Sequence, residues 1–540
     1  MKHRSLTLLI AAFVMCSMFL IGCNNSNSAS SNTSNGKKNI KPATTQTLAK
    51  KTGKDITIAV ANTFVSMDPH DTNDTLSYSA QKTMLEGLLG FDKDMKVVPV
   101  LAESYSVNPA ATEFTFKLRQ GIKFHDGTPF NAKAVKVNID RLANPTLNLK
   151  RHSLFKLVKE TTVVDENTVK VTLSQPFGAM INTFAHPAAM MISPKALETY
   201  GKDVAKNPVG TGPFKFAEWD PSDHLKVVKN DQYWRKGYPK VDSISFKPTP
   251  ENGSRVAKLQ TGEADFIYPV PSEQAESING KSGIVVENAQ SIIVRYLSMN
   301  TLKKPYNDVR VRQAINYAIN KDAFIKVVMN GFATPLDSII APNVQFYAKQ
   351  QPYQFNLEKA KQLLKEAGYD KGFTAKLWGN NDTGAIKGME FIQQQLAQIG
   401  IKVEIVPMES GTESDKIWNV EDPSKADIEL YYGGWSPSTG DADWGIRPLL
   451  GGNDAFPPKS YNTAYYNSQE VNQGISDALA TADTDKRKAA YEKLEKAIWN
   501  DAPWAFLSVD DTIAGKKNYL DGIYLLPDGS LDVSNIEIKQ

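Results

Sequence analysis

Cysteine is almost absent from this sequence of 540 residues, which contains Cys16 and Cys23 and no others. Cys16 lies in an apolar run, residues 6–21, behind a basic start, which is the pattern of a secretory signal peptide that is removed from the mature chain. With Cys16 removed, no disulfide can form within the chain, and a zinc site built from cysteines or catalysis by a free thiol is not expected.

Histidine and catalytic motifs are also scarce. The six histidines include no pair spaced three or four residues apart, and none follows His224. The sequence has no H-E-x-x-H, no G-x-S-x-G and no phosphate-binding loop. The glycine-rich segment 209–214 lacks the Lys-Ser/Thr pair of such a loop, and Pro213 removes a backbone donor. These absences predict a protein that is not an enzyme and that uses no cofactor or metal.

No large excess of charge of one sign is present. The formal net charge is +3, and acidic and basic residues are mixed along the chain. A nucleic-acid surface would need clustered basic residues, so no nucleic-acid partner is expected. Beyond residue 22 no apolar run approaches the length of a membrane span.

The first distinctive feature of the sequence is the segment that ends at Cys23. Residues 20–23, LIGC, resemble the lipobox at which bacterial lipoprotein signal peptides are cleaved. This resemblance implies a signal peptide over residues 1–22 and a lipid on Cys23, which would anchor the chain to a membrane. The polar residues that follow predict a disordered tether over 23–54. A plain signal peptide with a chance cysteine is the alternative.

The rest of the chain is too long for one hydrophobic core, so two or more domains are expected. Alternating or apolar segments predict strands over 55–60, 113–118 and 168–173. Asn131 is a candidate N-cap for a helix that buries Ala134, Val135 and Ile139. Further strands are predicted over 373–378, 401–406 and 426–432.

In the second half of the chain, helices alternate with these strands. They are predicted after the N-cap candidates Asp308 and Asn356, over 388–399 and over 486–499. Gly368 lies where a helix ends in a left-handed residue. This alternation predicts an α/β fold with a mostly parallel sheet.

The segment 431–445, YYGGWSPSTGDADWG, has an unusual composition, with two Trp, two Tyr, four Gly and two Asp. Ligands of α/β sheets bind in loops after strands. Trp435 and Trp444 would supply apolar walls, and Asp441 and Asp443 would supply charge for an ammonium group. A glycine-rich surface loop with core tryptophans is equally compatible with the sequence.

Several stretches resemble one family in order and spacing. They are MDPHDTNDTLS (67–77), LAESY (101–105), KLRQGIKFHDGTPFNAKAV (117–135), NPVGTGPF (207–214), KLQTGEADF (258–266), YNDVRVRQAINYAINK (306–321) and KAKQLLKEAGY (359–369). They are similar to the solute-binding subunits of peptide, opine and nickel importers of the ABC class. Other stretches, among them HPAAMMISP (186–194) and AIWNDAPW (497–504), are similar to the glutathione-binding components of such importers.

The resemblance implies a type II periplasmic-binding-protein-like α/β fold, with two lobes joined by a hinge and an extra subdomain in the first lobe. The chain would cross near 294–300 and return near 504–509. The implied boundaries are 55–297 for lobe I, 298–505 for lobe II and 506–540 for the return to lobe I.

The resemblance also implies a ligand site between the lobes. In dipeptide-binding relatives an Asp three positions after the loop Trp holds the ligand's α-ammonium, and this chain has Ser438 there. Asp441 or Asp443 would replace it for a γ-glutamyl peptide. Arg295 would replace the relatives' carboxylate-binding Arg, unless it is simply an exposed strand residue. Additional candidates are Trp435, Trp444, Asn73, Asp74, Thr75 and Arg151.

The function implied is that of a lipid-anchored extracellular receptor that binds glutathione or a related γ-glutamyl peptide. It would act as a monomer and deliver the peptide to an ABC permease and its ATPase, on the periplasmic side if an outer membrane is present. A receptor for di- or oligopeptides remains the alternative. A surface lipoprotein that acts as a chaperone or co-receptor is a third reading. Nickel is disfavoured because the second half of the chain has no histidine.

Overall fold

The computed structural model describes residues 53–539. Cys16, Cys23 and the predicted signal peptide and tether up to residue 52 lie outside the described residues. Within 53–539 the fold is α/β, and its largest feature is a sheet of eleven strands. These strands are β1 Asp55–Val60, β8 Phe214–Asp220, β9 His224–Lys229, β10 Ser243–Pro248, β11 Phe266–Tyr268, β12 Ile284–Met299, β13 Ala333–Pro335, β14 Phe373–Asn380, β15 Ile401–Met408, β16 Leu430–Trp435 and β17 Trp504–Lys517.

The order of the strands is β15-β14-β16-β12-β17-β11-β1-β10-β9-β8, with β13 beside β17. β14 pairs in parallel with β15 and β16, and β1 pairs in parallel with β10 and β11. Every pairing of β12 and β17 is antiparallel, as are those of β9. The sheet is therefore mixed. The prediction of a mostly parallel sheet was wrong, because the long strands β12 and β17 in its middle are antiparallel to all of their neighbours.

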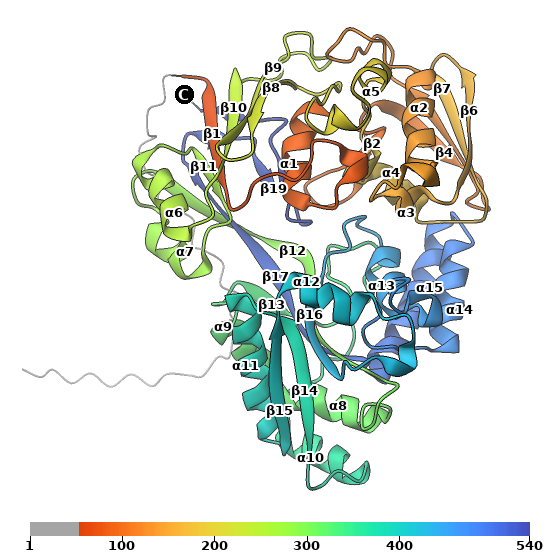
Figure 1. Ribbon diagram of the computed structural model, residues 1–540, viewed down its shortest axis with the longest axis vertical. Coiled ribbons are helices and arrows are strands. Elements are labelled where there is room, and N and C mark those ends of the chain that lie inside the picture. Colours follow the sequence, from red (N-terminus) through yellow and green to blue (C-terminus); the bar gives the residue numbers. More distant parts are fainter. Residues whose placement is uncertain (1–52, 540) are drawn as a thin grey trace, which may run out of the picture. The chain divides into compact units, whose positions relative to one another are not determined.

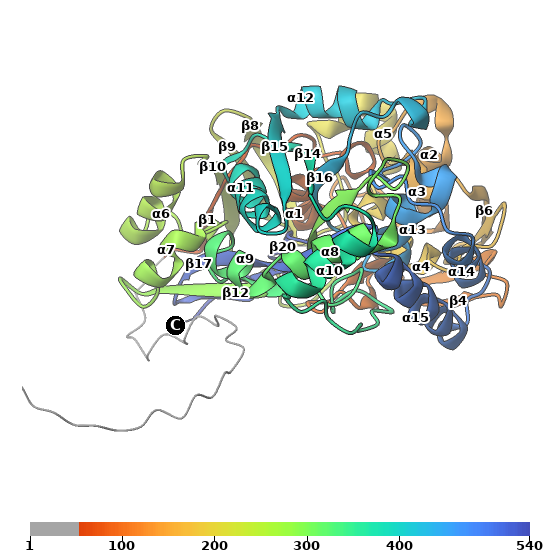
Figure 2. The ribbon, with the colours of Figure 1, turned by 90° about the horizontal axis from the view of Figure 1, so that it is seen from below.

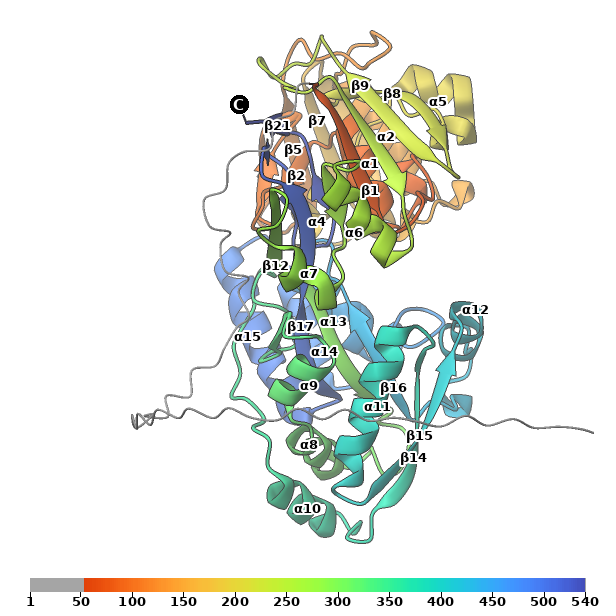
Figure 3. The same ribbon diagram turned by 90° about the vertical axis from the view of Figure 1, so that its left-hand side faces the viewer.

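β12 and β17 are the strands that join two groups of elements. β12 pairs with β17 from Ile284 to Ser298, with register shifts after Gln290 and Arg295. Figures 1 and 3 show these two strands running between the elements from β1 to α7 and the elements from α8 to α15. We call the first group, with the C-terminal strands β18–β21, lobe I and the second group lobe II. The crossing expected near 294–300 covers the last residues of β12 and one residue beyond it, and the return expected near 504–509 lies in β17.

Lobe I carries an additional four-stranded sheet with the order β4-β5-β7-β6. Alternating burial explains its strands, because Phe114, Phe116 and Leu118 of one strand all point into the core. Asn131 caps the helix over this sheet by accepting a hydrogen bond from the Ala134 N–H, as predicted. The elements of this subdomain are β4 Ala102–Val107, β5 Glu113–Leu118, β6 Val158–Asp165, β7 Thr168–Leu173, α2 Ala132–Ala143, α3 His152–Phe155 and α4 Met180–Ala185.

Several helices of lobe II also begin at a capping side chain. Asp308, Asn356 and Asp382 each accept a hydrogen bond from the backbone at the start of a helix. Figure 2 shows α8 and α10 side by side, and with α11 they enclose a core that includes the strands β14 and β16. These helices are α8 Val309–Ala318, α9 Lys321–Val327, α10 Leu357–Glu366, α11 Thr383–Ala397, α12 Ser410–Glu413, α13 Ala442–Leu450, α14 Gln469–Leu479 and α15 Thr484–Asp501.

Short elements complete lobe I. Its remaining helices and strands are α1 Thr75–Met84, α5 Pro194–Tyr200, α6 Asn252–Thr261, α7 Ser272–Ile278, β2 Leu89–Phe91, β3 Val97–Pro99, β18 Leu520–Asp521, β19 Tyr524–Leu525, β20 Leu531–Asp532 and β21 Glu537–Ile538. Among residues 53–539, no helix combines the length and the apolar character that crossing a membrane requires.

Candidate functional site

The aromatic segment 431–445 forms a strand, a short loop and the start of a helix. β16 runs from Leu430 to Trp435, so it ends three residues later than the strand predicted over 426–432, and α13 begins at Ala442. The expected long loop therefore shrinks to residues 436–441. Helix α13 begins early because the Asp441 side chain caps it, accepting a hydrogen bond of 2.9 Å from the Asp443 N–H.

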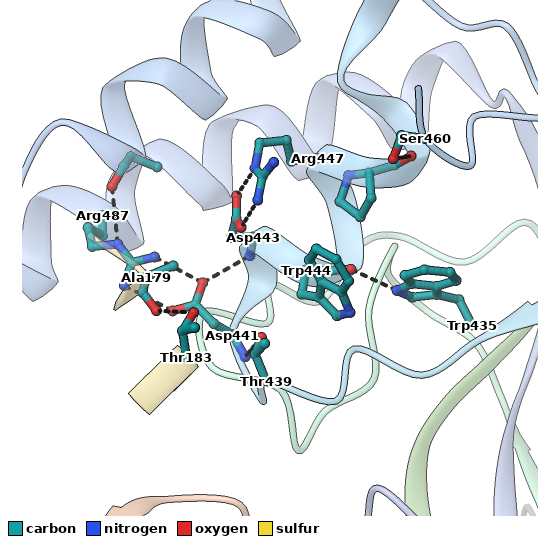
Figure 4. Close-up of polar contacts among 12 residues, drawn as sticks. Ala179, Thr183, Trp435, Thr439, Asp441, Asp443, Trp444, Arg447, Ser460 and Arg487 are labelled. Atoms are coloured by element: carbon teal, nitrogen blue, oxygen red, sulfur yellow. Dashed lines mark hydrogen bonds and ion pairs between the residues drawn. The ribbon is translucent and has the colours of Figure 1, made fainter. Parts of the chain in front are cut away.

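The Asp441 carboxylate is buried and already paired within the protein. Its side chain has no exposed surface, and its two oxygens accept hydrogen bonds of 2.9 Å from both terminal nitrogens of Arg487 on α15. Figure 4 shows this pair below the ion pair of Asp443 and Arg447. The Asp441 carboxylate thus accepts hydrogen bonds from three nitrogens, the backbone N–H of Asp443 and the two terminal nitrogens of Arg487. The geometry therefore favours Asp443 over Asp441 for contact with a ligand.

Asp443 and Arg447 form an ion pair one helical turn apart on α13. Nε and Nη2 of Arg447 lie 2.7 Å from Oδ1 and Oδ2 of Asp443. Burial lowers the pKa of Arg447, but the acidic groups around it, above all the Asp443 carboxylate, more than offset this, so the net shift raises the pKa. The guanidinium also lies over the Phe177 ring, 5.6 Å from its centre.

This ion pair lines a cavity of about 710 Å³ between residues of lobe I and of lobe II. Lys150, Arg151, Lys156, Arg447 and Lys459 bring positive charge to its lining, and Asp443 and Asp454 bring negative charge. Phe177, Trp444 and Tyr461 add aromatic surface. The excess of cations suits a ligand with more carboxylates than ammonium groups, and the volume is that of a small-molecule site.

Lobe I contributes Arg151 to this cavity. Its Nε donates to the Thr72 carbonyl at 2.8 Å and to the Tyr78 hydroxyl at 2.7 Å, which fixes the guanidinium over the Tyr78 ring. Among residues 53–539, its two terminal nitrogens make no hydrogen bond, so they remain available for a carboxylate. The sequence-based candidate Arg151 therefore lines the cavity, and its role in binding stays a prediction.

The three candidates in 73–75 take different positions. Asn73 is exposed and lines the cavity. Asp74 instead caps α1, accepting hydrogen bonds from the N–H and the hydroxyl of Ser77. Thr75 is the first residue of that helix and does not line the cavity.

The two tryptophans lie side by side. Trp435 Nε1 donates to the Trp444 carbonyl at 2.7 Å, and the ring centres are 6.0 Å apart (Figure 4). Trp444 lines the cavity, whereas Trp435 packs behind it and against Tyr461.

Ser438 is held by lobe I. Nδ1 of His186 accepts the Ala188 N–H at 3.0 Å, so the proton of the neutral ring lies on Nε2, which is 3.2 Å from Ser438 Oγ. Burial, followed by the charges of Arg151 and Lys82, keeps the pKa of His186 well below its ordinary value. Asn182 also donates to the neighbouring Thr439 carbonyl at 3.0 Å.

Arg295 lies away from the cavity that contains Asp443. Its Nε donates to Asp510 Oδ2 at 2.8 Å, and it lines a second cavity of about 380 Å³ with Asp382 and Tyr432. The structure does not bring Arg295 and Asp443 together in one cavity.

Sequence reasoning missed Arg447, Lys459 and Tyr461. The spacing of Asp443 and Arg447 was a usable signal, because residues four apart on a helix are neighbours. It was overlooked because 431–445 was interpreted as loop. In the part of the chain that the structure describes, no group of acidic or histidine side chains is arranged to hold a metal ion.

Sequence comparison identifies related proteins. A family model described as bacterial extracellular solute-binding proteins, family 5 Middle, matches residues 96–457. The glutathione-binding protein GsiB of Pectobacterium atrosepticum is 46% identical over 488 residues, covering 90% of this chain and 95% of that protein. The protein of the same name from Escherichia coli O157:H7 is 42% identical over 487 residues, with the same coverage.

Solved structures share the fold. DppA of Helicobacter pylori, in complex with the peptide STSA, has a TM-score of 0.75 and 27% identity and covers 90% of this chain and 98% of its own. HbpA2 of Haemophilus parasuis has a TM-score of 0.79 and 26% identity and covers 90% and 100%.

Proposed function

The chain belongs to family 5 of the bacterial extracellular solute-binding proteins, and from this premise we propose that it binds glutathione or a related γ-glutamyl peptide for an ABC importer. It is the solute-binding subunit, and the permease and ATPase are its partners. The relatives at 42–46% identity are named for glutathione binding, which supports this ligand.

The observation that carries the proposal is the charge around the cavity of about 710 Å³. Glutathione has two carboxylates and one ammonium group. The ammonium needs a buried acid, for which Asp443 is suited, and the carboxylates need cations, for which Arg151 and Arg447 are suited. Charges removed from water on binding must each find such a partner.

A receptor for ordinary di- or oligopeptides is the second candidate. It is favoured by the likeness to DppA of Helicobacter pylori, whose structure contains a peptide. Against it stands Ser438, at the position where the dipeptide-binding relatives have an acid. Its hydroxyl pairs with His186 and carries no charge for an α-ammonium.

The lobe boundaries form part of the proposal. Lobe I would comprise residues 55–297 and the return 506–540, and lobe II would comprise 298–505. Closure of the two lobes about β12 and β17 would enclose the ligand, and it requires only that the ligand bind the closed state more tightly.

A thermal-shift screen tests the ligand. A ligand that binds only the folded protein stabilises it by about 2.7 kcal/mol at one hundred times its Kd. We expect glutathione to raise Tm more than Ala-Ala or Ala-Ala-Ala at equal concentration. A larger shift with the alanine peptides would support the second candidate, and no shift with any of them would favour a protein-binding lipoprotein.

Membrane attachment is also part of the proposal, with Cys23 as the lipidated residue after cleavage of residues 1–22. Cys23→Ala should abolish labelling with radioactive palmitate in cells, and Cys16→Ala is the matched control that should keep it. Equal labelling of Cys23→Ala and the wild type would rule out this anchor.

A further inference from the structure

Asp443 and Arg447 place an anion and a cation next to each other at the wall of the cavity. The Asp443 side chain is 3% exposed and that of Arg447 is 35% exposed, so the acid lies deeper and the cation is nearer the open space. Both are on helix α13, which is held at its first turn by the buried pair of Asp441 and Arg487. The two groups are therefore fixed relative to each other.

Each member of the pair keeps unused bonding capacity. A carboxylate has about four lone-pair positions, and Arg447 uses one on each oxygen of Asp443. Nη1 of Arg447 makes no hydrogen bond among residues 53–539. A ligand ammonium can thus add to Asp443 while a ligand carboxylate adds to Arg447, without breaking the pair.

We infer that the Asp443–Arg447 pair recognises the free amino-acid end of a γ-glutamyl group. This inference rests on the proposed function. In a γ-glutamyl peptide one carbon carries both the ammonium and a carboxylate, so the two charges are adjacent and match the adjacent pair. In an α-linked peptide the ammonium and the terminal carboxylate lie at opposite ends of the molecule. The pair therefore selects γ-glutamyl over α-linked peptides.

A second consequence concerns the rest of the ligand. If the γ-glutamyl end supplies the recognition, γ-glutamylcysteine keeps the recognised group although it lacks glycine. Cysteinylglycine lacks the whole group, and N-acetylglutathione keeps the peptide but has no ammonium. These compounds separate recognition of this end from recognition of the peptide as a whole.

Calorimetric titration of the full chain with these four compounds tests the inference. The wild type should bind γ-glutamylcysteine within about tenfold of glutathione, and N-acetylglutathione and cysteinylglycine at least about 30-fold more weakly, since an unpaired buried charge is costly. Asp443→Asn and Arg447→Lys should each weaken glutathione at least about 30-fold.

The decisive readout is selectivity, which a purely structural role would not change. Asp443→Asn should bind glutathione and N-acetylglutathione within about threefold of each other. Asp140→Asn, which alters an exposed pair with Lys136 four residues earlier on α2, should retain the wild-type selectivity.

Two kinds of result would contradict the inference, and they can be distinguished. If the wild type binds glutathione and N-acetylglutathione equally well, or if Asp443→Asn keeps the wild-type preference, the inference fails and the proposed function stands. If the wild type does not bind glutathione, the proposed function fails and the inference fails with it.

Discussion

Arg295 holds a buried carboxylate, and this gives it a structural role before any role in binding. Burial raises the pKa of Asp510, and the charge of Arg295 counteracts this. The Asp510 side chain is 8% exposed, and Arg295 lies 2.8 Å away. Arg295→Ala should therefore lower the free energy of unfolding by about 1–3 kcal/mol, because a buried acceptor loses its donor.

Urea denaturation at pH 7 measures this loss, and a second change supplies the control. Asp510→Asn in the Arg295→Ala background should recover most of the stability, since the unpaired charge is gone. A double variant no more stable than Arg295→Ala would contradict the account. Titration of Arg295→Ala with glutathione tests the separate, sequence-based proposal that Arg295 binds a ligand carboxylate.

Glu495 on α15 predicts a pH dependence of stability. Burial raises its pKa to about 8 from an ordinary value of 4.5. The Ser338 hydroxyl and the Ala348 N–H donate hydrogen bonds to the carboxylate, which lowers the pKa but does not offset burial. Between these pH values the folded state keeps a proton that the unfolded state has released. Stability therefore falls as pH rises, by about 1.4 kcal/mol per pH unit from this group.

Glu495→Gln keeps the shape of the neutral carboxyl group and does not titrate. The difference in stability between the wild type and Glu495→Gln should shift in favour of the variant from pH 5 to pH 8, as measured by urea denaturation. Other titrating groups cancel in this difference. Parallel pH profiles of the two proteins would show that Glu495 ionises normally.

At the scale of elements, the loop 436–441 depends on α15. Arg487 is the bidentate partner of Asp441, which is wholly buried and caps α13. Arg487→Met should cost about 3–5 kcal/mol of stability, because a buried charge loses its partner. Lys488→Met changes the exposed neighbour on the same helix and is the matched control.

Thermal or urea denaturation of the two variants checks this prediction. Asp441→Ser in the Arg487→Met background should restore part of the stability, because serine still caps the helix but carries no charge. If Arg487→Met were as stable as Lys488→Met within about 0.5 kcal/mol, the pair would not hold the loop.

The elements that the sequence predicted best have strong local signals. β5 and β7 match their predicted ranges, and the predicted caps Asn131, Asp308 and Asn356 all hold helices. Alternating burial and side-chain capping act within a few residues, so they can be recognised without knowledge of the fold.

Features that depend on residues far apart in the sequence could not be predicted from it. The start of α13 depends on Asp441, whose charge is compensated by Arg487, a residue 46 positions later. The mixed character of the sheet depends on β12 and β17, which pair across more than two hundred residues. The separation of Arg295 from Asp443 likewise follows from where each strand and helix lies in the fold.

At the scale of the whole molecule, lobe I and lobe II also touch away from β12 and β17. The Gly178 N–H donates to the Leu479 carbonyl at 2.8 Å, and the Ala482 N–H donates to the Pro109 carbonyl at 3.3 Å. A Cβ on Gly178 would lie 2.3 Å from the Thr481 carbonyl oxygen, so the backbones approach as closely as glycine allows. Opening of the cavity by movement of the lobes has to break these contacts.

The measurement that tests the account most directly is a calorimetric titration of the wild-type protein with glutathione and with Ala-Ala. The account predicts saturable binding of glutathione with a Kd at least about tenfold lower than that of Ala-Ala, a difference of about 1.4 kcal/mol. Equal or tighter binding of Ala-Ala, or no saturable binding of glutathione, would contradict it.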